Sequence, residues 1–573
     1  KLYKEYLSFE PKSYRSHPYL QDGYRYYSRQ AGKEPYSVHY RIKDLPGAAE
    51  ELILDENKLA RGKQFFALGI FSVSRDGNLL AYSVDSKGDE NYQLFIKDLS
   101  SGKTITTGLT GLSEAIWKAD SRTLLLTRIN ERYQTDTVWS YDLESGKAEL
   151  LHQEQDPAWD LGLYLGCSRE MVFLLSSSKN ATEAFFMDIS YPSNTWQLLA
   201  GRSPDHIYYP DFYAGCFYIQ SNLQNPDFSI YTADKHSFEP SAWKMIVPGS
   251  PGSPLSSFQI NEHAIVVIAR HQGFERLELW DRQGGGFLYT LDQEDRVNLG
   301  FWETSQPAAD WFYYSLESEL HPYSIYQHSF SSRCDSLVYQ YPLPAAIHPE
   351  RYQTELIMVQ TADGVQIPLS LIYAKTLDRK QPQATLLYGY GAYGDVEDPY
   401  FSSSIFPLLD RGLIYAVANI RGGGEFGKQW YDGGRLMSKQ NSFTDFVACI
   451  DYLLEQGISS REKLAIQGGS AGGLLIGSVL NLAWDRIKLA VLDVPFVDPV
   501  NTMLDPSLPL TIQEYEEWGN PALPEVFSYI LSYSPYDNIK SVNYPTTLIS
   551  SALNDSRVGY WEGLKFAQKL RSL

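Results

Sequence analysis

The chain has 573 residues, 43% hydrophobic residues and a formal net charge of −20 at pH 7. So acidic a surface repels nucleic acid and anionic lipid and attracts cationic ligands. No stretch reaches the roughly 18 consecutive apolar residues of a membrane helix, and the N-terminus does not resemble a signal peptide. The four cysteines have neither metal nor redox spacing, which is typical of a reducing compartment. We therefore expect a soluble cytoplasmic protein of about two to four domains, without nucleic-acid or membrane partners.

From residue 19 to residue 341 the sequence is rich in strands, aromatic residues and turns. A strand–turn–strand unit recurs at roughly 45 to 50 residues, which is the size of one four-stranded propeller blade. The strands that open these units are expected at 23–27, 79–83, 123–127, 171–175, 216–220, 264–268 and 311–315, with partners that include 92–98, 138–142 and 277–281. Seven units predict a seven-bladed β-propeller over residues 17–344. Two stacked β-sandwiches, the alternative, do not predict so even a period.

A proline-rich linker at residues 342–349 marks a change to alternating strands and helices. A hairpin is expected at 355–360 and 365–373, around the turn Asp363-Gly364. The strands and the helix expected after it are 385–388, 413–418, 442–455 (the helix), an elbow strand from 464, 489–492 and 546–550. This order predicts an α/β-hydrolase domain over residues 345–573. Residues 1–16 form a short segment that we expect to pack on this domain.

A nucleophile elbow is predicted around Ser470, in the segment 468–473 (GGSAGG). An apolar run from residue 464 precedes the serine and a run with helical spacing follows it, as expected for a strand-to-helix turn. Gly468 and Gly472 flank the serine because a Cβ in so sharp a turn would strike the neighbouring strand or helix. The alternative is a glycine-rich turn whose serine only caps a helix.

Asp555 is the predicted acid of a Ser–Asp–His triad, because it follows a late strand at the carboxyl edge of the sheet. Asp493 and Asp498, at the end of an earlier strand, are the alternatives. Asp555 would orient a histidine that takes the proton from Ser470. No histidine follows His348, so the chain is expected to end before the last strand and the triad histidine, or else to be a pseudoenzyme. The ten histidines have no ligand spacing, and neither a metal nor a cofactor is expected.

The oxyanion hole is expected to have two donors. One is the backbone N–H of Ala471, the residue after the nucleophile. The second would come from the loop 388–394 (YGYGAYG), where glycines allow close approach and a tyrosine hydroxyl can donate. Aromatic packing under a turn accounts for at least two of the three tyrosines.

Several motifs together resemble the prolyl oligopeptidase family of serine peptidases. They are 388–391 (YGYG), 419–427 (NIRGGGEFG), 468–473 (GGSAGG) and 534–538 (SPYDN). Within the family, the segments 494–498 (VPFVD), 502–505 (TMLD) and 514–521 (EYEEWGNP) are most similar to oligopeptidase B. The resemblance implies a peptidase that cuts short peptides after Lys or Arg, with a propeller that screens the site from folded proteins. It also implies that Ser470 is the nucleophile, Asp555 the acid and Tyr390 the oxyanion donor, and that Arg557 binds a substrate backbone carbonyl.

The same resemblance places the pocket for P1, the residue before the scissile bond, at Glu514 and Glu516, with Phe496 packing on the P1 side chain. Paired carboxylates suit a cationic side chain in a partly desolvated cleft, and a guanidinium can be held in bidentate fashion. A solvated helix turn is the alternative for the two glutamates. A second acidic subsite corresponds to Asp398, but its companion position holds Tyr400, so a preference for basic P2 residues stays open.

Three functions remain after this reading of the sequence. The first is a cofactor-free serine oligopeptidase that acts after Arg or Lys. Post-proline cleavage or esterase activity on the same scaffold is the second, although a prolyl pocket would be apolar and aromatic. A propeller scaffold without catalysis is the third, and the absent histidine favours it.

Overall fold

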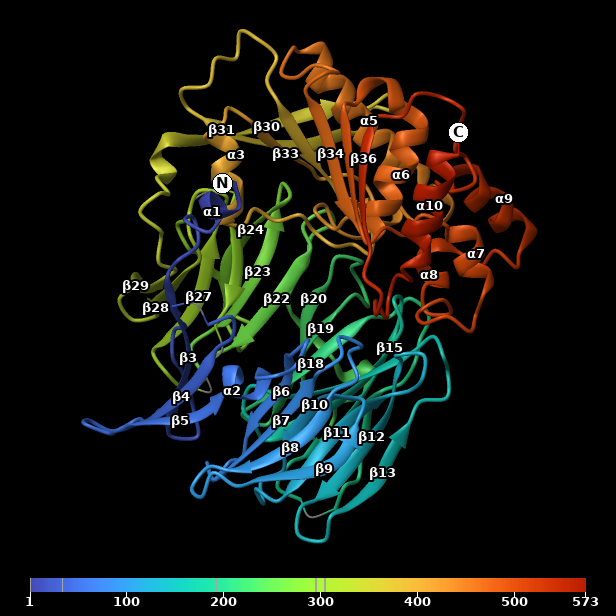
Figure 1. Cartoon of the computed structure of the whole chain (residues 1–573). Helices are drawn as coiled ribbons and strands as arrows, with labels where there is room; N and C mark the ends of the chain where they lie inside the picture. Colours follow the sequence, from blue (N-terminus) through green and yellow to red (C-terminus); the bar gives the residue numbers. More distant parts are fainter. Residues whose placement is uncertain (1, 33, 192, 294–295, 303–305, 573) are drawn as a thin grey trace.

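The computed structural model describes residues 2–32, 34–191, 193–293, 296–302 and 306–572. The chain forms two parts, a propeller (blue to green in Figure 1) and a hydrolase part (yellow to red). Residues 1 and 573, the outer ends of the first and third predicted regions, lie outside the described residues. None of the described helices is long and apolar enough to cross a membrane.

Seven antiparallel sheets of sequential strands form the blades, which confirms the predicted seven-bladed propeller. The first contains β1 (Ser13–Arg15), β2 (Tyr19–Gln21), β3 (Tyr24–Ala31), β4 (Val38–Lys43) and β5 (Glu50–Asp55). The next three contain β6 (Ala67–Val73), β7 (Leu79–Asp85), β8 (Gln93–Asp98) and β9 (Thr104–Thr110); β10 (Leu112–Trp117), β11 (Thr123–Ile129), β12 (Thr135–Asp142) and β13 (Lys147–Gln153); and β14 (Asp160–Leu165), β15 (Met171–Ser177), β16 (Thr182–Asp188) and β17 (Gln197–Ala200). The last three contain β18 (Tyr208–Tyr213), β19 (Cys216–Ser221), β20 (Ser229–Asp234) and β21 (Lys244–Val247); β22 (Leu255–Ile260), β23 (Ile265–His271), β24 (Phe274–Trp280) and β25 (Phe287–Thr290); and β26 (Asn298–Phe301), β27 (Trp311–Glu317), β28 (Ser324–Ser329) and β29 (Cys334–Gln340).

The strands expected to open the units are not the first strands of the blades. The run at 79–83, for example, lies in β7, which follows β6 and pairs with both β6 and β8. Each such strand is central in its sheet, and β7 and β23 are buried along most of their length. The outer strands β13 and β29 are largely exposed, so their sequences lack an apolar pattern. Apolar periodicity therefore finds the buried middle of a blade before its edges.

The hydrolase part is built on one seven-stranded sheet with the order β30-β31-β33-β32-β34-β35-β36. Its strands are β30 (Tyr352–Gln360), β31 (Gln366–Ala374), β32 (Thr385–Tyr388), β33 (Ile414–Ala418), β34 (Leu464–Gly469), β35 (Leu489–Asp493) and β36 (Thr546–Ser550). β30, β31 and β33 pair antiparallel, and all later pairs are parallel. The predicted entry hairpin and the alternation after it are confirmed.

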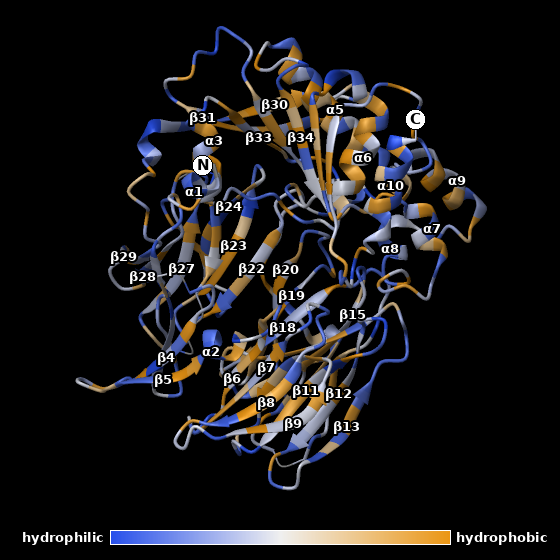
Figure 2. Cartoon of the chain, viewed as in Figure 1, coloured by the Kyte–Doolittle hydropathy of each residue, from blue (hydrophilic) through white to orange (hydrophobic). Residues whose placement is uncertain are grey.

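Helices flank this sheet and connect its strands. They are α3 (Phe406–Leu409), α4 (Lys428–Asp432), α5 (Gln440–Glu455), α6 (Ala471–Ala483), α7 (Pro499–Leu504), α8 (Tyr515–Trp518), α9 (Pro524–Tyr533) and α10 (Trp561–Arg571). The propeller half has α1 (Leu2–Tyr6) and α2 (Glu56–Ala60), and single 3₁₀ turns lie at Pro240–Ala242, Pro349–Arg351, Ser403–Ile405, Leu436–Ser438 and Trp484–Arg486. Apolar residues dominate the central strands and α6 in Figure 2. α6 is buried along almost its whole length, so the helix behind the serine is part of the core.

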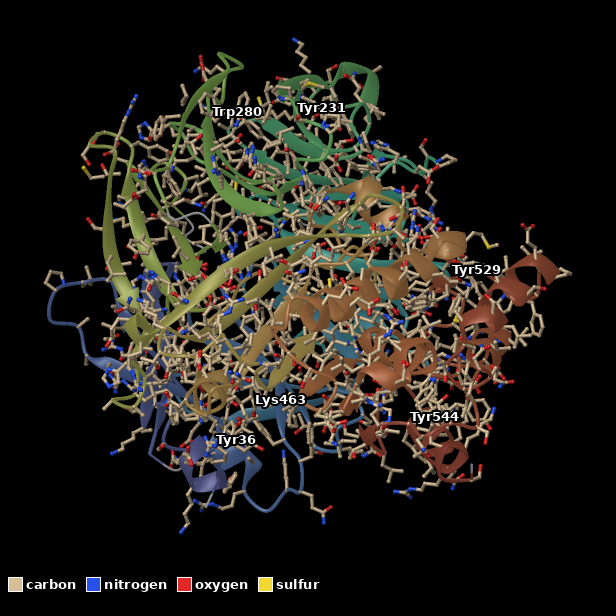
Figure 3. All side chains as sticks on the ribbon, turned by 90° about the horizontal axis from the view of Figure 1, so that it is seen from above. Tyr36, Tyr231, Trp280, Lys463, Tyr529 and Tyr544 are labelled. Atoms are coloured by element: carbon tan, nitrogen blue, oxygen red, sulfur yellow. The ribbon has the colours of Figure 1, made fainter. Side chains whose placement is uncertain are left out.

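The chain before β36 is attached to α6. The Tyr544 hydroxyl donates a hydrogen bond to Asn481 Oδ1 at 2.6 Å, and Lys540 Nζ donates to the Asn481 carbonyl at 2.8 Å. Tyr544 and Tyr529 both lie in the C-terminal part of the chain, far from Tyr231 and Trp280 of the propeller (Figure 3). These contacts fix the strand that leads to Asp555.

The N-terminal segment contacts the hydrolase part, and α1 lies beside α3 in Figure 1. Arg411 Nη1 lies 2.9 Å from Glu5 Oε1, and Ser403 donates to Glu10 Oε1 at 2.6 Å. Phe9 is buried in one apolar cluster with Phe406 and other hydrolase residues. The first residues of the chain thus bridge to the second part of the molecule.

Candidate active site

Ser470 lies at the turn between β34 and α6, with φ of +53° and ψ of −118°. This backbone conformation is unfavourable for a residue with a side chain and is a feature of strained functional turns. The neighbouring glycines are required by space. A Cβ on Gly468 would lie 2.5 Å from the Gly472 carbonyl oxygen, and one on Gly472 would lie 3.0 Å from the Gly389 carbonyl oxygen. The turn has the geometry of a nucleophile elbow.

Backbone hydrogen bonds fix the position of the elbow. Ser470 N donates to the Asp493 carbonyl at 2.9 Å, and the Ser470 carbonyl accepts from Gly473 N and Phe496 N at 2.9 and 3.1 Å. The serine is therefore tied to the end of β35 as well as to its own helix.

A cavity of about 500 Å³ lies between the two parts of the molecule and contains Ser470. From the hydrolase part its lining includes Ala471, Tyr390, Tyr393, Asp395, Phe496, Glu514, Trp518 and Arg557. The propeller contributes residues at the start of β14 and the end of β15, which include Asp160 and Lys179. β15 lies close to α8 in Figure 1, where the two parts meet. A peptide carbonyl at Ser470 would therefore be enclosed from both sides.

Tyr390 and Ala471 stand beside Ser470 as possible oxyanion donors. Tyr390 lines the same cavity as Ser470. Burial raises the pKa of Tyr390 and the Ser470 side chain opposes this rise, so the hydroxyl stays protonated. Ala471 is the first residue of α6, so its N–H lies at the positive end of the helix dipole. Both residues line the cavity together with Ser470.

Glu514 and Glu516 do not have the same environment. Glu514 lines the cavity, whereas Glu516 does not. Glu514 directly precedes the short helix α8, and residues three apart on a helix share a face while residues two apart do not. Glu517, three residues on, is completely buried and accepts a hydrogen bond from Tyr393 N at 3.0 Å. The structure thus brings Glu514, and not the predicted pair, to the nucleophile.

The Glu514 carboxylate is almost enclosed. Burial raises its pKa, and the ammonium of Lys179 opposes this rise. Lys179 Nζ lies 3.4 Å from Glu514 Oε1. The other oxygen, Oε2, is buried and has no hydrogen-bond partner among the described residues. Phe496, the predicted contact of the P1 side chain, is buried and packs on Trp518 at a ring distance of 5.5 Å.

Lys439 holds the loop 388–394 in place through a hydrogen bond to its backbone, a role that the sequence did not suggest. Its buried Nζ donates to the Gly391 carbonyl at 2.5 Å and to Ser442 Oγ at 3.3 Å. Burial lowers the pKa of Lys439 to about 8, while Glu517 opposes this shift. The spacing of Glu514 and Glu517 could have pointed to a shared helix face, but Lys179 and Lys439 left no signal in the sequence.

Asp555 lines a second cavity of about 300 Å³, which shares Arg557 with the first. Its Oδ1 accepts hydrogen bonds from Arg557 N and Val558 N, both at 2.9 Å. These backbone donors orient the carboxylate. The Arg557 side chain is 69% exposed, and its Nη2 lies 3.3 Å from Glu90 Oε2 of the propeller.

The two alternative acids have structural partners. Asp493 accepts hydrogen bonds from Gln467 Nε2 at 3.1 Å and Ser550 Oγ at 2.8 Å. Asp498 is fully buried, caps α7 and pairs with Lys565. No histidine lines either cavity in the described ranges of the chain.

Asp398 lies outside both cavities and is paired across the two parts of the molecule. Arg270 of β23 donates from Nη1 to Asp398 Oδ1 at 2.8 Å and from Nη2 to Oδ2 at 2.5 Å. Arg270 is 5% exposed and also binds Glu275. Asp398 shares a separate small pocket with Tyr400. A substrate cation would have to replace this bidentate pair, so the position does not form an open acidic subsite.

Comparison with known proteins finds relatives that match the whole chain. Residues 1–340 match the prolyl oligopeptidase N-terminal beta-propeller domain, and residues 399–573 match the prolyl oligopeptidase family. Dipeptidyl aminopeptidase BI of Pseudoxanthomonas mexicana is 34% identical over all of this chain and 82% of its own length. Protease 2 of Moraxella lacunata is 28% identical over all of this chain and 84% of its own length. The structure of oligopeptidase B from Leishmania major superposes with a TM-score of 0.94 at 31% identity, over all of this chain and 82% of that one. The chain belongs to the prolyl oligopeptidase family of serine peptidases, whose members are hydrolases of peptides.

Proposed function

We propose that this protein hydrolyses short peptides on the carboxyl side of Arg or Lys through an acyl-enzyme on Ser470. One observation carries the proposal. The elbow serine, a protonated tyrosine hydroxyl and a buried carboxylate with one unpaired oxygen all line the same cavity.

The chemistry follows from the positions around Ser470. The Ser470 Oγ would attack the peptide carbonyl carbon, and the oxyanion would accept hydrogen bonds from Ala471 N–H and the Tyr390 hydroxyl. When the C–N bond breaks, the proton from Oγ goes to the leaving amine, and water later hydrolyses the ester. We assign Asp555 to orient a histidine that would transfer this proton, a role for which none of the ten histidines of the sequence, all within the described ranges, lines either cavity. The ten histidines of the sequence all lie at or before His348.

Specificity for a basic P1 residue rests on Glu514. A carboxylate in so enclosed a place is costly without a partner, and a guanidinium or ammonium supplies one. Phe496 would pack on the aliphatic part of the P1 side chain. A related structure at 30% identity and a TM-score of 0.94 is described as oligopeptidase B from Trypanosoma brucei with covalently bound antipain, in closed form. An apolar prolyl pocket would not place a carboxylate here.

Substrate size would be limited because the cavity lies between the two parts. The propeller residues Ala158, Asp160 and 177–179 line it together with hydrolase residues. A folded protein could not present a peptide bond in such a space. The cytoplasmic location that we propose rests on the four free thiols.

The test compares peptides that differ only at P1. We would measure binding of acetyl-Gly-Gly-Arg and acetyl-Gly-Gly-citrulline, which needs no general base, and hydrolysis of fluorogenic peptides with Arg, citrulline or Pro at P1. Citrulline has the shape of arginine without its charge. We expect the Arg peptides to be favoured in both measurements. Equal treatment of Arg and citrulline, or a preference for Pro, would overturn the assignment.

A further inference from the structure

Lys179 lies where a basic P1 side chain would meet Glu514. It belongs to the turn between β15 and β16 of the propeller, and it lines the cavity together with Ser470. Its Nζ lies 3.4 Å from Glu514 Oε1 and 4.4 Å from the centre of the Tyr393 ring. The acidic end of the cavity therefore already holds a cation supplied by the protein.

The turn that carries Lys179 is held against the hydrolase part by its neighbour. Asn180 Oδ1 accepts a hydrogen bond from Arg435 Nη1 at 3.0 Å. Arg435 is buried and pairs with Asp432 at 2.8 Å. Closely beside it, Gln513 donates to Asp160 at 2.5 Å, which is a second contact between the two parts. The position of Lys179 is thus linked to the contacts between the two parts of the molecule.

The contact between Lys179 and Glu514 is weaker than the contact a substrate cation could make. At 3.4 Å it is longer than a charge-assisted hydrogen bond, and 27% of the Lys179 side chain is exposed. Burial raises the pKa of Asp160 and of Asp395, and Lys179 opposes both rises, so its charge is shared among three carboxylates of the cavity. A planar guanidinium could bind Glu514 in bidentate fashion, which an ammonium cannot do.

We propose that Lys179 is a specificity-determining residue, a resident cation that a basic P1 side chain must displace from Glu514. The inference rests on the proposed function and adds that Lys179 competes with the P1 side chain for Glu514. A neutral P1 side chain leaves the Lys179–Glu514 pair in place, whereas a basic one exchanges with it. Lys179 therefore reduces the difference in affinity between peptides with Arg and peptides with neutral residues at P1. Because Lys179 belongs to the propeller, this difference also depends on the position of the propeller relative to the hydrolase part.

The experiment removes the charge of Lys179 and keeps its length. We would measure the Kd of acetyl-Gly-Gly-Arg and acetyl-Gly-Gly-citrulline by calorimetry for wild type, Lys179→Met and Lys179→Arg. The matched control is Lys235→Met, an exposed lysine of the propeller outside the cavity. We expect Lys179→Met to tighten the Arg peptide by about two- to tenfold and to leave the citrulline peptide unchanged. Lys179→Arg keeps a competing cation that can bind Glu514 in bidentate fashion, so it should not tighten the Arg peptide, and Lys235→Met should behave like wild type.

A second background tests whether Lys179 acts through Glu514. In Glu514→Gln, adding Lys179→Met should no longer favour the Arg peptide, because Glu514, the carboxylate for which the two cations compete, is gone. If Lys179→Met weakens both peptides equally, or changes neither, the lysine only holds the two parts together and the inference is wrong.

The outcome also separates this inference from the proposed function. If wild type does not distinguish Arg from citrulline but Lys179→Met does, the proposed specificity of the wild-type protein fails and the competitor role stands. If wild type prefers Arg and Lys179→Met does not increase that preference, the proposed specificity stands and the competitor role fails. If neither protein prefers Arg, both fail.

Discussion

The two halves of the molecule contribute to the site in different ways. In the hydrolase half, the nucleophile and its oxyanion donors come from contiguous segments, the elbow 468–473 and the loop 388–394. The propeller half repeats one unit seven times and has no segment that looks catalytic, yet it supplies Asp160 and Lys179 to the cavity. The proposed nucleophile and oxyanion donors are thus encoded in two short segments, whereas the proposed specificity depends on contacts between the halves.

The largest effect should come from the reaction centre itself. In a protein that carries the triad histidine, Ser470→Ala should lower kcat for an Arg-P1 peptide by about 10⁴-fold or more, because the attacking oxygen is removed. Binding of acetyl-Gly-Gly-Arg should persist in this variant. Turnover close to the wild-type rate would break the assignment of the reaction to the hydrolase half.

Tyr390→Phe should have the next largest effect. The loss of one oxyanion donor should reduce kcat by about 10²-fold while KM changes little, because the donor acts on the transition state. Tyr388→Phe is the control, since this hydroxyl does not line the cavity. An equal loss in both variants would show that the effect is not specific to the Tyr390 hydroxyl and would contradict its assignment as the oxyanion donor.

Glu514→Gln and Glu516→Gln test whether P1 is bound by Glu514 alone, as the structure indicates, or by both glutamates, as the family resemblance implies. Glu514→Gln should raise KM for Arg-P1 peptides by about tenfold or more and leave citrulline peptides nearly unchanged. Glu516→Gln should change neither, because its side chain does not line the cavity. If Glu516→Gln has the larger effect, the P1 pocket lies on the other face of α8.

A smaller, pH-dependent effect is expected where the halves meet near Arg270. Burial raises the pKa of Glu425 and of Glu397 from 4.5 to about 7, and Glu425 Oε2 has no partner among the described residues. Arg270 opposes the shift of Glu425, whereas Asp398 raises that of Glu397. Because the folded pKa is above the unfolded one, the folded state binds more protons between these values, and stability falls as pH rises through this window.

Glu425→Gln keeps the shape of the protonated acid and removes this dependence. Relative to wild type, its thermal midpoint should be higher at about pH 8 than at about pH 5.5. Exposed Glu149→Gln serves as the control with no such trend. A constant difference between Glu425→Gln and wild type at both pH values would show that the carboxyl titrates in the same way in the folded and unfolded states.

The sequence predicted the parts of the site that depend on short segments. Glycines at 468 and 472 around Ser470 gave the elbow, and the entry hairpin with the strands after it gave the hydrolase sheet. The seven repeats predicted the propeller, although the strands thought to open the blades are the third strand of the first blade and the second strand of the others. Exposed outer strands carry no apolar pattern, so the register of a blade could not be read.

Contacts between segments that are distant in the chain could not be predicted from the sequence. Nothing in the residues around Lys179 indicates a carboxylate at position 514, and nothing near Asp398 indicates Arg270. The expectation that Glu514 pairs with Glu516 came from family resemblance. In the structure, the short helix α8 places Glu517, and not Glu516, on the same face as Glu514. Tertiary placement decides these cases, since a carboxylate looks the same in sequence whether it is exposed, paired or catalytic.

The most direct test of the central claim is a crystal structure with acetyl-Gly-Gly-Arg bound. We predict the C-terminal carboxylate of the peptide within hydrogen-bond distance of the Tyr390 hydroxyl and Ser470 Oγ, and its guanidinium on Glu514. A guanidinium on Glu516 or Asp398, or a peptide bound away from the cavity between the two parts, would contradict the account.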